Sequence, residues 1–191
     1  MKLGLKLVIG WLAVLAAQGC HSPVQQAVDY CASQAARTLE IVPSDDRMPN
    51  CVEAGSSEWL FTTPGGWTCG FWPGELWYLY EATGDSMWKE PAVRATDAIL
   101  PVAYQTAHSH DVGFMLMPSV GLAYSLTGDE KYRDALVSGA DSLATLFNAN
   151  VGTILSWPGM VRKMDWPHNT IIDNMLNLEL LFWVAENSSS R

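Results

Sequence analysis

The apolar positions of the chain fall into segments with helical spacing. The spacing predicts a one-sided helix over residues 24–39, a helix over 87–104 and an amphipathic helix over 131–147. Residues 71–81 and 111–126 are strongly apolar segments between them. In residues 170–183 the apolar positions lie almost all round the helical projection, which is typical of a helix buried on most sides. We therefore expect an all-α fold.

The stretches between these segments carry turn and loop signals. Residues 43–66 are rich in Pro, Ser, Asp and Gly, and residues 148–169 contain two Trp-Pro pairs. Both predict long loops. A loop as long as residues 43–66 is often functional in a compact domain.

A repeat connects the helical segments. Residues 80–88 recur as 124–132, offset by 44 positions, each with a Tyr, then Thr-Gly-Asp, then an aromatic residue. The Gly predicts a helix stop and the following Asp predicts a cap for the next helix. Residues 171–186 resemble the first helix of a third unit. Repeated helical hairpins of this kind predict two concentric helix layers.

The repeat register places polar residues at equivalent points. In a closed ring of hairpins, the starts of the inner helices and their preceding loops meet at one face. Here those points are residues 67–72, His110-Asp111 and Asp173-Asn174. We therefore expect Asp111 and Asp173 to face one another across a single cavity.

Asp173 has two readings. A carboxylate in a mostly buried helix is costly unless it is paired, hydrogen-bonded or kept neutral, which favours a chemical role. Thr170 and Asp173 also have the spacing of a capping box, with Thr170 as the N-cap. The two readings are compatible, because an acid at a helix N-terminus interacts favourably with the helix dipole in either case.

Asp111 has the same ambiguity. It follows His108 and His110 and precedes an apolar segment, so it is either an N-cap beside exposed loop histidines or part of a site. A His-x-His pair can bind a metal, but no further His or Cys cluster supports one, so no metal is expected. A pair of carboxyl groups in a cavity lined by tryptophans suits glycoside chemistry.

Composition narrows the classes of partner. The 191 residues suffice for one domain with a core, and they include nine Trp, which fill a core or stack on sugar rings. The formal net charge of −9 argues against nucleic acid and against an anionic membrane surface as partners.

The N-terminus has the pattern of an export signal. Lys2 and Lys6 precede the apolar run at residues 7–17, which is too short to span a membrane as a mature anchor. Residues 17–20 resemble a lipoprotein cleavage box, with Cys20 as the lipidated residue, and plain cleavage is the alternative. We expect residues 1–20 to be a signal peptide, of lipoprotein type if Cys20 is lipidated, and the mature chain to be periplasmic or at the cell surface. Membrane attachment would then occur through Cys20.

Three further cysteines have no zinc spacing. Cys31 and Cys51 could form a disulfide in an oxidising compartment, and simple buried thiols are the alternative for both and for Cys69.

Three long motifs, residues 70–80, 110–114 and 171–181, together resemble glycoside hydrolase family 88, the unsaturated glucuronyl hydrolases. The resemblance covers roughly residues 25–186 and keeps the three motifs in order. It implies an (α/α)6 barrel and, without a cofactor, hydrolysis of oligosaccharides that polysaccharide lyases leave with a 4,5-unsaturated uronic acid. Products of glycosaminoglycan lyases are the substrates that it implies first.

The resemblance also implies roles for single residues. Asp173 would protonate C4 of the unsaturated ring and then, as a carboxylate, activate the water that adds at C5. Asp111 would hold the sugar hydroxyls and stabilise developing charge. The residues that line the site would be His110, Trp67, Trp157 and Asn174.

The length of the chain departs from the family. At about 44 residues per hairpin, six hairpins need roughly twice residues 21–191, so we expect about half of the ring, its N-terminal part. We expect no turnover from such an incomplete copy alone. Two other readings stay open: an unsaturated rhamnogalacturonyl hydrolase with the same fold, and an inactive carbohydrate-binding lipoprotein whose aspartates are caps.

Overall fold

The computed structural model describes residues 22–187. The chain divides into two compact units, Met1–Arg37 and Thr38–Arg191. The described part of the first unit is one helix, α2 (Pro23–Ile41), which ends just past the unit boundary. This confirms the helix expected over residues 24–39. The signal segment 1–20 and its Cys20 lie outside the described residues.

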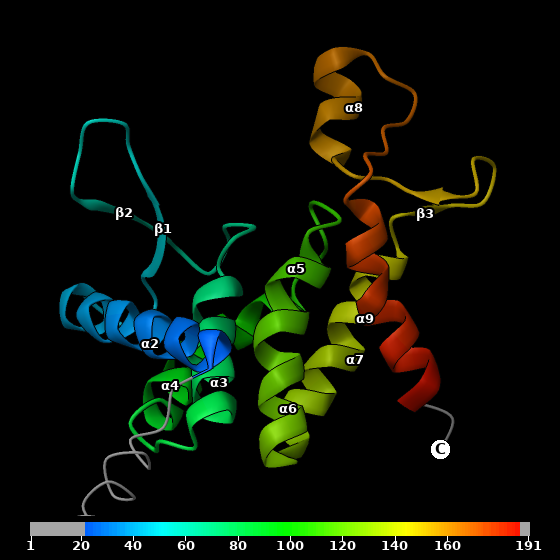
Figure 1. Ribbon diagram of the computed structural model, residues 1–191. Helices are drawn as coiled ribbons and strands as arrows, with labels where there is room; N and C mark the ends of the chain where they lie inside the picture. The colour runs from blue at the N-terminus through cyan, green and yellow to red at the C-terminus, as the bar shows by residue number, and fades with distance from the viewer. Residues whose placement is uncertain (1–21, 188–191) are drawn as a thin grey trace, which may run out of the picture. The chain divides into compact units, whose positions relative to one another are not determined.

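The second unit holds the repeated helices, which Figure 1 labels. Their bounds are α3 (Phe71–Thr83), α4 (Lys89–Ile99), the 3₁₀ helix η1 (Leu100–Tyr104), α5 (Val112–Leu116), the π-helical turn η2 (Met117–Gly121), α6 (Leu122–Thr127), α7 (Glu130–Ala144), α8 (Pro158–Met164) and α9 (Asn174–Asn187). The apolar segments and amphipathic helices of the sequence therefore form as expected, within a few residues at their ends.

Two prolines explain where the helices lose regularity. Pro101 opens η1 and Pro118 lies in the first turn of η2. Proline has no N–H to donate and its ring crowds the preceding turn, so the regular α-helical ladder cannot run through it. As a result, the segment expected as one helix over 111–126 is α5, η2 and α6 in succession.

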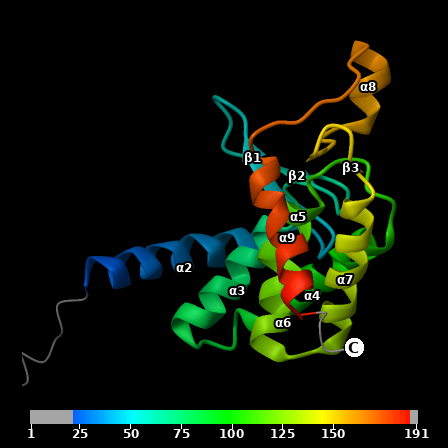
Figure 2. The same cartoon turned by 90° about the vertical axis from the view of Figure 1, so that its right-hand side faces the viewer.

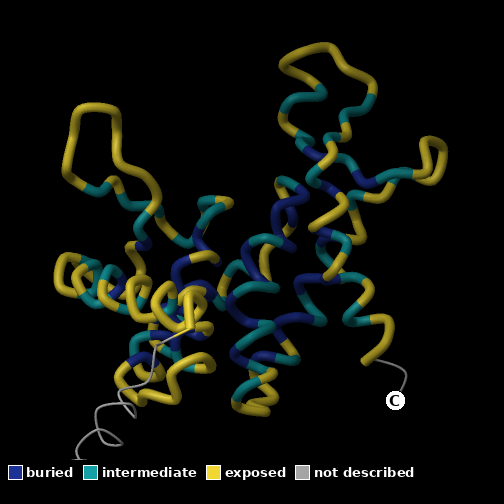
Figure 3. Tube along the Cα trace, in the orientation of Figure 1, coloured by how far each residue is buried: buried dark blue, intermediate teal, exposed yellow. Residues whose placement is uncertain are grey.

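The helices of the second unit pack as two layers. Helix α3 contacts α6 and η2, and α9 contacts α5, while α4 lies against α3 and α7 against α6. Figure 2 shows α9 running alongside α5, with α7 beside it. Buried positions concentrate along these helices, and the tips of the loops are exposed (Figure 3).

Glycines let the inner helices approach closely. A Cβ on Gly74 of α3 would lie 2.5 Å from the Pro118 carbonyl oxygen, and one on Gly113 of α5 would lie 2.6 Å from the Cα of Asn177 in α9. Side chains at these positions would push the helices apart. Close backbone packing therefore fixes the positions of α3, α5 and α9.

Both expected loops contain regular structure, which corrects the sequence interpretation. Residues 43–66 contain the antiparallel pair β1 (Met48–Val52) and β2 (Trp59–Thr62), with an irregularity between Pro49 and Cys51. Residues 147–169 contain the pair β3 (Phe147–Asn148) and β4 (Thr153–Ile154), followed by α8. These strands are too short and too irregular to show a period of two in the sequence.

Within the described residues, no helix is both long and apolar enough to cross a membrane. Cys31 and Cys51 are free thiols but exposed, so the alternative of buried thiols is wrong for these two, whereas Cys69 is a free, buried thiol as that alternative expects. Burial raises the pKa of the Cys69 thiol to about 12.

Candidate active site

Three ionisable side chains come together where α5 and α9 begin. The Nε2 atom of His110 lies 3.4 Å from Oδ1 of Asp111 and 3.7 Å from Oδ2 of Asp173. Among residues 22–187, His110 is the only basic side chain within 4.0 Å of either carboxylate. The structure thus brings together the two carboxylates that the repeat register placed at one face.

Asp111 is positioned by its neighbour rather than by a capping bond. It occupies the N-cap position of α5, but its side chain makes no capping hydrogen bond. Instead the Ser109 hydroxyl donates to Asp111 Oδ2 over 2.7 Å, and the Asp111 backbone N–H donates back to that hydroxyl. The capping role considered for Asp111 is therefore wrong, and its Oδ1 is left facing His110.

Asp173 is the residue just before α9, and no capping box forms there. Thr170, the expected cap, donates its hydroxyl to the Ile154 carbonyl instead. Asp173 Oδ1 is buried with no hydrogen-bond partner among the described residues, although the whole side chain is 34% exposed. A buried carboxylate oxygen without a partner is costly, so this atom is suited to meet a ligand or a proton.

His110 is fully buried, which corrects the alternative of an exposed loop histidine. Its Nδ1 lies 3.3 Å from the Ser156 hydroxyl, and its backbone N–H donates to the Ser156 carbonyl. Its ring packs nearly perpendicular to that of Trp157, with the ring centroids 5.9 Å apart. His108, by contrast, is exposed. Only one histidine of the His-x-His pair therefore belongs to the site.

Backbone and side-chain hydrogen bonds hold Ser156 in place. The Ser156 backbone N–H donates to the Asn169 carbonyl, and the Asn169 side chain exchanges two hydrogen bonds with the backbone of Trp157. The Ile171 N–H donates to the Ser156 hydroxyl. The segments before α8 and before α9 are therefore bound together, and His110 is attached to both.

Asn177 fixes α5 against α9. It is fully buried, its Oδ1 accepts the Phe114 N–H over 2.9 Å, and its Nδ2 donates to the Asp173 carbonyl over 3.2 Å. It therefore ties the backbone next to one carboxylate to the backbone of the other. The sequence showed Asn177 as a polar residue in an apolar helix but did not indicate this role.

The remaining expected site residues divide into two groups. Trp157 touches His110 and lies at the site. Trp67 is 54% exposed and packs edge-on against Phe71 and Phe114, so it belongs to an aromatic group that does not include His110 or Trp157. Asn174 is buried and donates to the Ile154 carbonyl over 2.7 Å, so its amide nitrogen holds the β3–β4 hairpin to α9.

The three clustered side chains are also the described group that could reach one metal ion. One ligand atom from each of His110, Asp111 and Asp173 lies within 4.8 Å of the others. A neutral imidazole with two carboxylates is a donor set that divalent ions accept, provided that Nε2 offers its lone pair.

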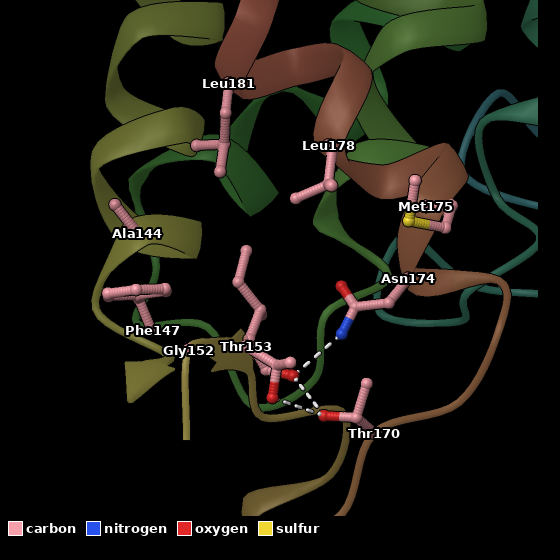
Figure 4. A pocket seen from close by; sticks show the side chains of 10 residues that line it. Ala144, Phe147, Gly152, Thr153, Thr170, Asn174, Met175, Leu178 and Leu181 are labelled. Carbon is pink, nitrogen blue, oxygen red and sulfur yellow. Dashed lines mark hydrogen bonds between the residues drawn. The ribbon is translucent and has the colours of Figure 1, made fainter. Parts of the chain in front are cut away.

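An apolar cavity of about 540 Å³ lies beside the carboxylates but is not lined by them. Figure 4 shows Leu178 and Leu181 of α9 on one wall and the polar groups of Thr153, Thr170 and Asn174 gathered at one edge. No charged side chain lines it, so it is not the place where acid–base chemistry would occur.

The chain has curated relatives, although no family model matches it. It is 39% identical over 117 residues to an unsaturated glucuronyl hydrolase of Formosa agariphila, covering 61% of this chain and 28% of that protein. It is 33% identical over 166 residues to the unsaturated glucuronyl hydrolase of Bacillus sp. strain GL1, covering 86% of this chain and 43% of that protein. The chain is a partial relative of the unsaturated glucuronyl hydrolases. An unsaturated chondroitin disaccharide hydrolase of Streptococcus pneumoniae is 32% identical over 127 residues, which are 65% of this chain and 32% of that protein.

Solved structures agree with this relationship. An unsaturated glucuronyl hydrolase specific for heparin matches with a TM-score of 0.78 and 36% identity, over 86% of this chain and 43% of that one. The Bacillus sp. GL1 enzyme, described as responsible for the degradation of glycosaminoglycan, matches with a TM-score of 0.76 and 32% identity, over 87% and 44%. The all-α fold and the resemblance drawn from the motifs are thereby confirmed. The chain spans less than half the length of these hydrolases.

Proposed function

We propose that this chain carries the acid–base residue, and the second carboxylate beside it, of a glycoside hydrolase that removes 4,5-unsaturated uronic acid from oligosaccharides. The observation that carries the proposal is the meeting of Asp111 and Asp173 around the buried His110. The relationship to unsaturated glucuronyl hydrolases supports the same chemistry.

In this proposal Asp173 moves the proton. Its carboxyl group donates a proton to C4 of the unsaturated ring, and the positive charge that develops at C5 is shared with the ring oxygen. A water molecule then adds at C5 and gives its proton to the Asp173 carboxylate, which restores the acid. The resulting hemiketal opens and releases the neighbouring sugar. The partly exposed carboxyl with one unpartnered buried oxygen suits both steps.

The neighbouring residues position the sugar. Asp111, held by Ser109 on one oxygen, presents its other oxygen to a sugar hydroxyl. Trp157 offers an aromatic face beside His110 for stacking on the ring. Trp67 would contact a more distant part of the substrate, and Asn174 would act through its buried, unpartnered Oδ1.

The substrate class follows from the relatives. They are named for glucuronyl and chondroitin substrates, and solved neighbours are described as specific for heparin or as degrading glycosaminoglycan. We propose glycosaminoglycan lyase products as the substrates of this site. The basic and apolar pattern of residues 1–20 supports export to the periplasm or the cell surface, with lipidation of Cys20 as the means of attachment.

The test uses turnover of an unsaturated chondroitin disaccharide, followed by loss of the ultraviolet absorbance of its double bond. Because the chain spans less than half of its relatives, it is assayed alone and fused to the remaining part of the Bacillus sp. GL1 enzyme. We expect turnover from the fusion. Asp173→Asn should lower its rate by roughly 10²–10⁴-fold, the usual contribution of a general acid–base.

Asp165→Asn is the matched control. Asp165 is an exposed aspartate in the segment before α9, with a positive φ of 53° that Asn also adopts readily. We expect no loss of rate from it. Circular dichroism should show the same helicity for all three proteins. A folded fusion whose rate is unaffected by Asp173→Asn would exclude this role for Asp173.

A further inference from the structure

The hydroxyl of Ser156 lies between a backbone donor and the buried histidine. Ser156 is fully buried. Its Oγ accepts the Ile171 N–H over 3.1 Å and lies 3.3 Å from His110 Nδ1. A backbone N–H can only donate, so one acceptor position of the hydroxyl is occupied and the direction of that hydrogen bond is certain.

The hydroxyl hydrogen then has one available acceptor among the described residues, which is Nδ1 of His110. If Nδ1 carried a hydrogen, it would donate to Oγ, and the serine hydrogen would be buried without a partner. An unsatisfied buried donor costs about 1–3 kcal/mol. The arrangement that satisfies every group has Ser156 donating to a bare Nδ1.

The opposite side of the ring leads to the same assignment. His110 Nε2 faces Oδ1 of Asp111 at 3.4 Å and Oδ2 of Asp173 at 3.7 Å. A lone pair on Nε2 would lie close to two acceptors and be repelled by them, whereas a hydrogen there would be attracted to both. Nε2 makes no hydrogen bond to either carboxylate in this structure, and catalytic hydrogen bonds are often long or poorly aligned until substrate binds.

We propose that Ser156 is a positioning residue that fixes neutral His110 in the tautomer with its hydrogen on Nε2, directed between Asp111 and Asp173. The serine itself touches neither carboxylate. It acts through the imidazole, whose orientation is set by the hydrogen bond at its other nitrogen. This tautomer also withholds the Nε2 lone pair that a metal ion at the cluster would need.

The consequence for catalysis rests on the proposed function. When Asp173 gives its proton to C4, it becomes a carboxylate next to Asp111, and two negative charges then lie close together. An Nε2 hydrogen already aimed between them stabilises the new charge without reorganisation. The same hydrogen is present when the carboxylate takes a proton back from water. Ser156 would thereby keep Asp173 ready for both steps.

The test is the protonation state of the ring, measured by nuclear magnetic resonance on the chain labelled with ¹⁵N-histidine. The chain has four histidines, and the loss of signals in His110→Gln, His108→Gln and His168→Gln identifies each. At a pH where His110 is neutral, we expect the hydrogen on Nε2, and an Nδ1 resonance shifted from that of the urea-unfolded chain toward the value of a hydrogen-bonded acceptor. In Ser156→Ala we expect that shift to be lost, and in Ser156→Thr, which keeps the hydroxyl, we expect it to return.

Thr170→Val is the control for a merely structural effect. It removes a hydroxyl that bonds the Ile154 carbonyl in the same pair of segments, without touching His110. We expect its His110 resonances to match those of the wild type. A hydrogen on Nδ1 in the wild type, or equal changes in Ser156→Ala and Thr170→Val, would overturn the proposal.

The measurement does not depend on turnover. If Ser156→Ala does not fold, the comparison of folded and unfolded wild type still decides the proposal. If the wild-type fusion shows no turnover while His110 has the proposed tautomer, the result counts against the proposed function. The proposal for Ser156 then stands.

Discussion

The two ends of the helical layers are built in different ways. At one end the turns Thr83–Asp85 and Thr127–Asp129 are nearly identical: the Thr hydroxyl donates four residues back, the Gly has a φ of 67°, and the Asp side chain accepts an N–H two residues on. At the other end Ser109 holds Asp111 locally, but the segments that carry the two carboxylates are joined by bonds between residues 46 and 63 positions apart. Only short-range bonds shape these turns, whereas the site end needs long-range bonds as well.

The two ends also differ in whether their buried polar atoms have hydrogen-bond partners. The buried polar side-chain atoms without partners among the described residues are His110 Nε2, Asp173 Oδ1 and Asn174 Oδ1, all at the site end. Proteins rarely leave such atoms unsatisfied without a reason. The difference indicates that the turn end serves stability, whereas the site end keeps capacity for a ligand.

The largest effect should come from a glycine at the site end. Gly113→Ala places a Cβ within 2.7 Å of three atoms of Asn177, all of them backbone or hydrogen-bonded, so α5 and α9 must separate. We expect the free energy of unfolding to fall by about 3 kcal/mol. In Gly128→Ala at the turn end, the new Cβ meets no atom within 4 Å. The only cost is that Ala must adopt the left-handed φ of 67°. We expect that change to cost about 1 kcal/mol. Urea denaturation measures both, and equal losses would contradict the difference between the two ends.

A smaller effect should come from a cap at the turn end. Asp129→Ala removes the side chain that accepts the Lys131 N–H at the start of α7. We expect a loss of about 1 kcal/mol in the free energy of unfolding, and no change in the His110 resonances. Asp134→Ala, within the same helix, is the control for loss of a negative charge. A change at His110 in Asp129→Ala would show that the two ends are coupled.

The smallest effect on stability should come from a hydrogen bond that links the two hairpins. It should appear only at alkaline pH. The Tyr132 hydroxyl donates to Asp97 over 3.0 Å. Burial and the Asp97 charge raise the pKa of Tyr132 well above its ordinary value of 10.0. Above pH 10 the unfolded chain therefore binds fewer protons than the folded chain, so stability falls as pH rises.

One such group limits the slope to about 1.4 kcal/mol per pH unit. Tyr132→Phe should flatten this slope and leave the slope near pH 7 unchanged, as measured by urea denaturation across pH. Tyr124→Phe, whose hydroxyl bonds none of the described residues, should leave both slopes unchanged. A wild-type slope that persists in Tyr132→Phe would exclude Tyr132 as its source.

The sequence by itself determined the helices, the turns and the register of the repeat. Helical periodicity and the Thr-Gly-Asp turns act within a few residues, so they can be read from the order of side chains. The register of that repeat also placed Asp111 and Asp173 at the same end, and the structure brings them to His110.

Only the tertiary structure decided how the pair is held. Ser156 and Asn177 owe their roles to partners far along the chain, and Thr170 gives up a local cap for the Ile154 carbonyl. A hydroxyl or an amide has the same sequence signature whichever partner it finds. Those partners exist only after the close packing at Gly113 has brought α9 against α5.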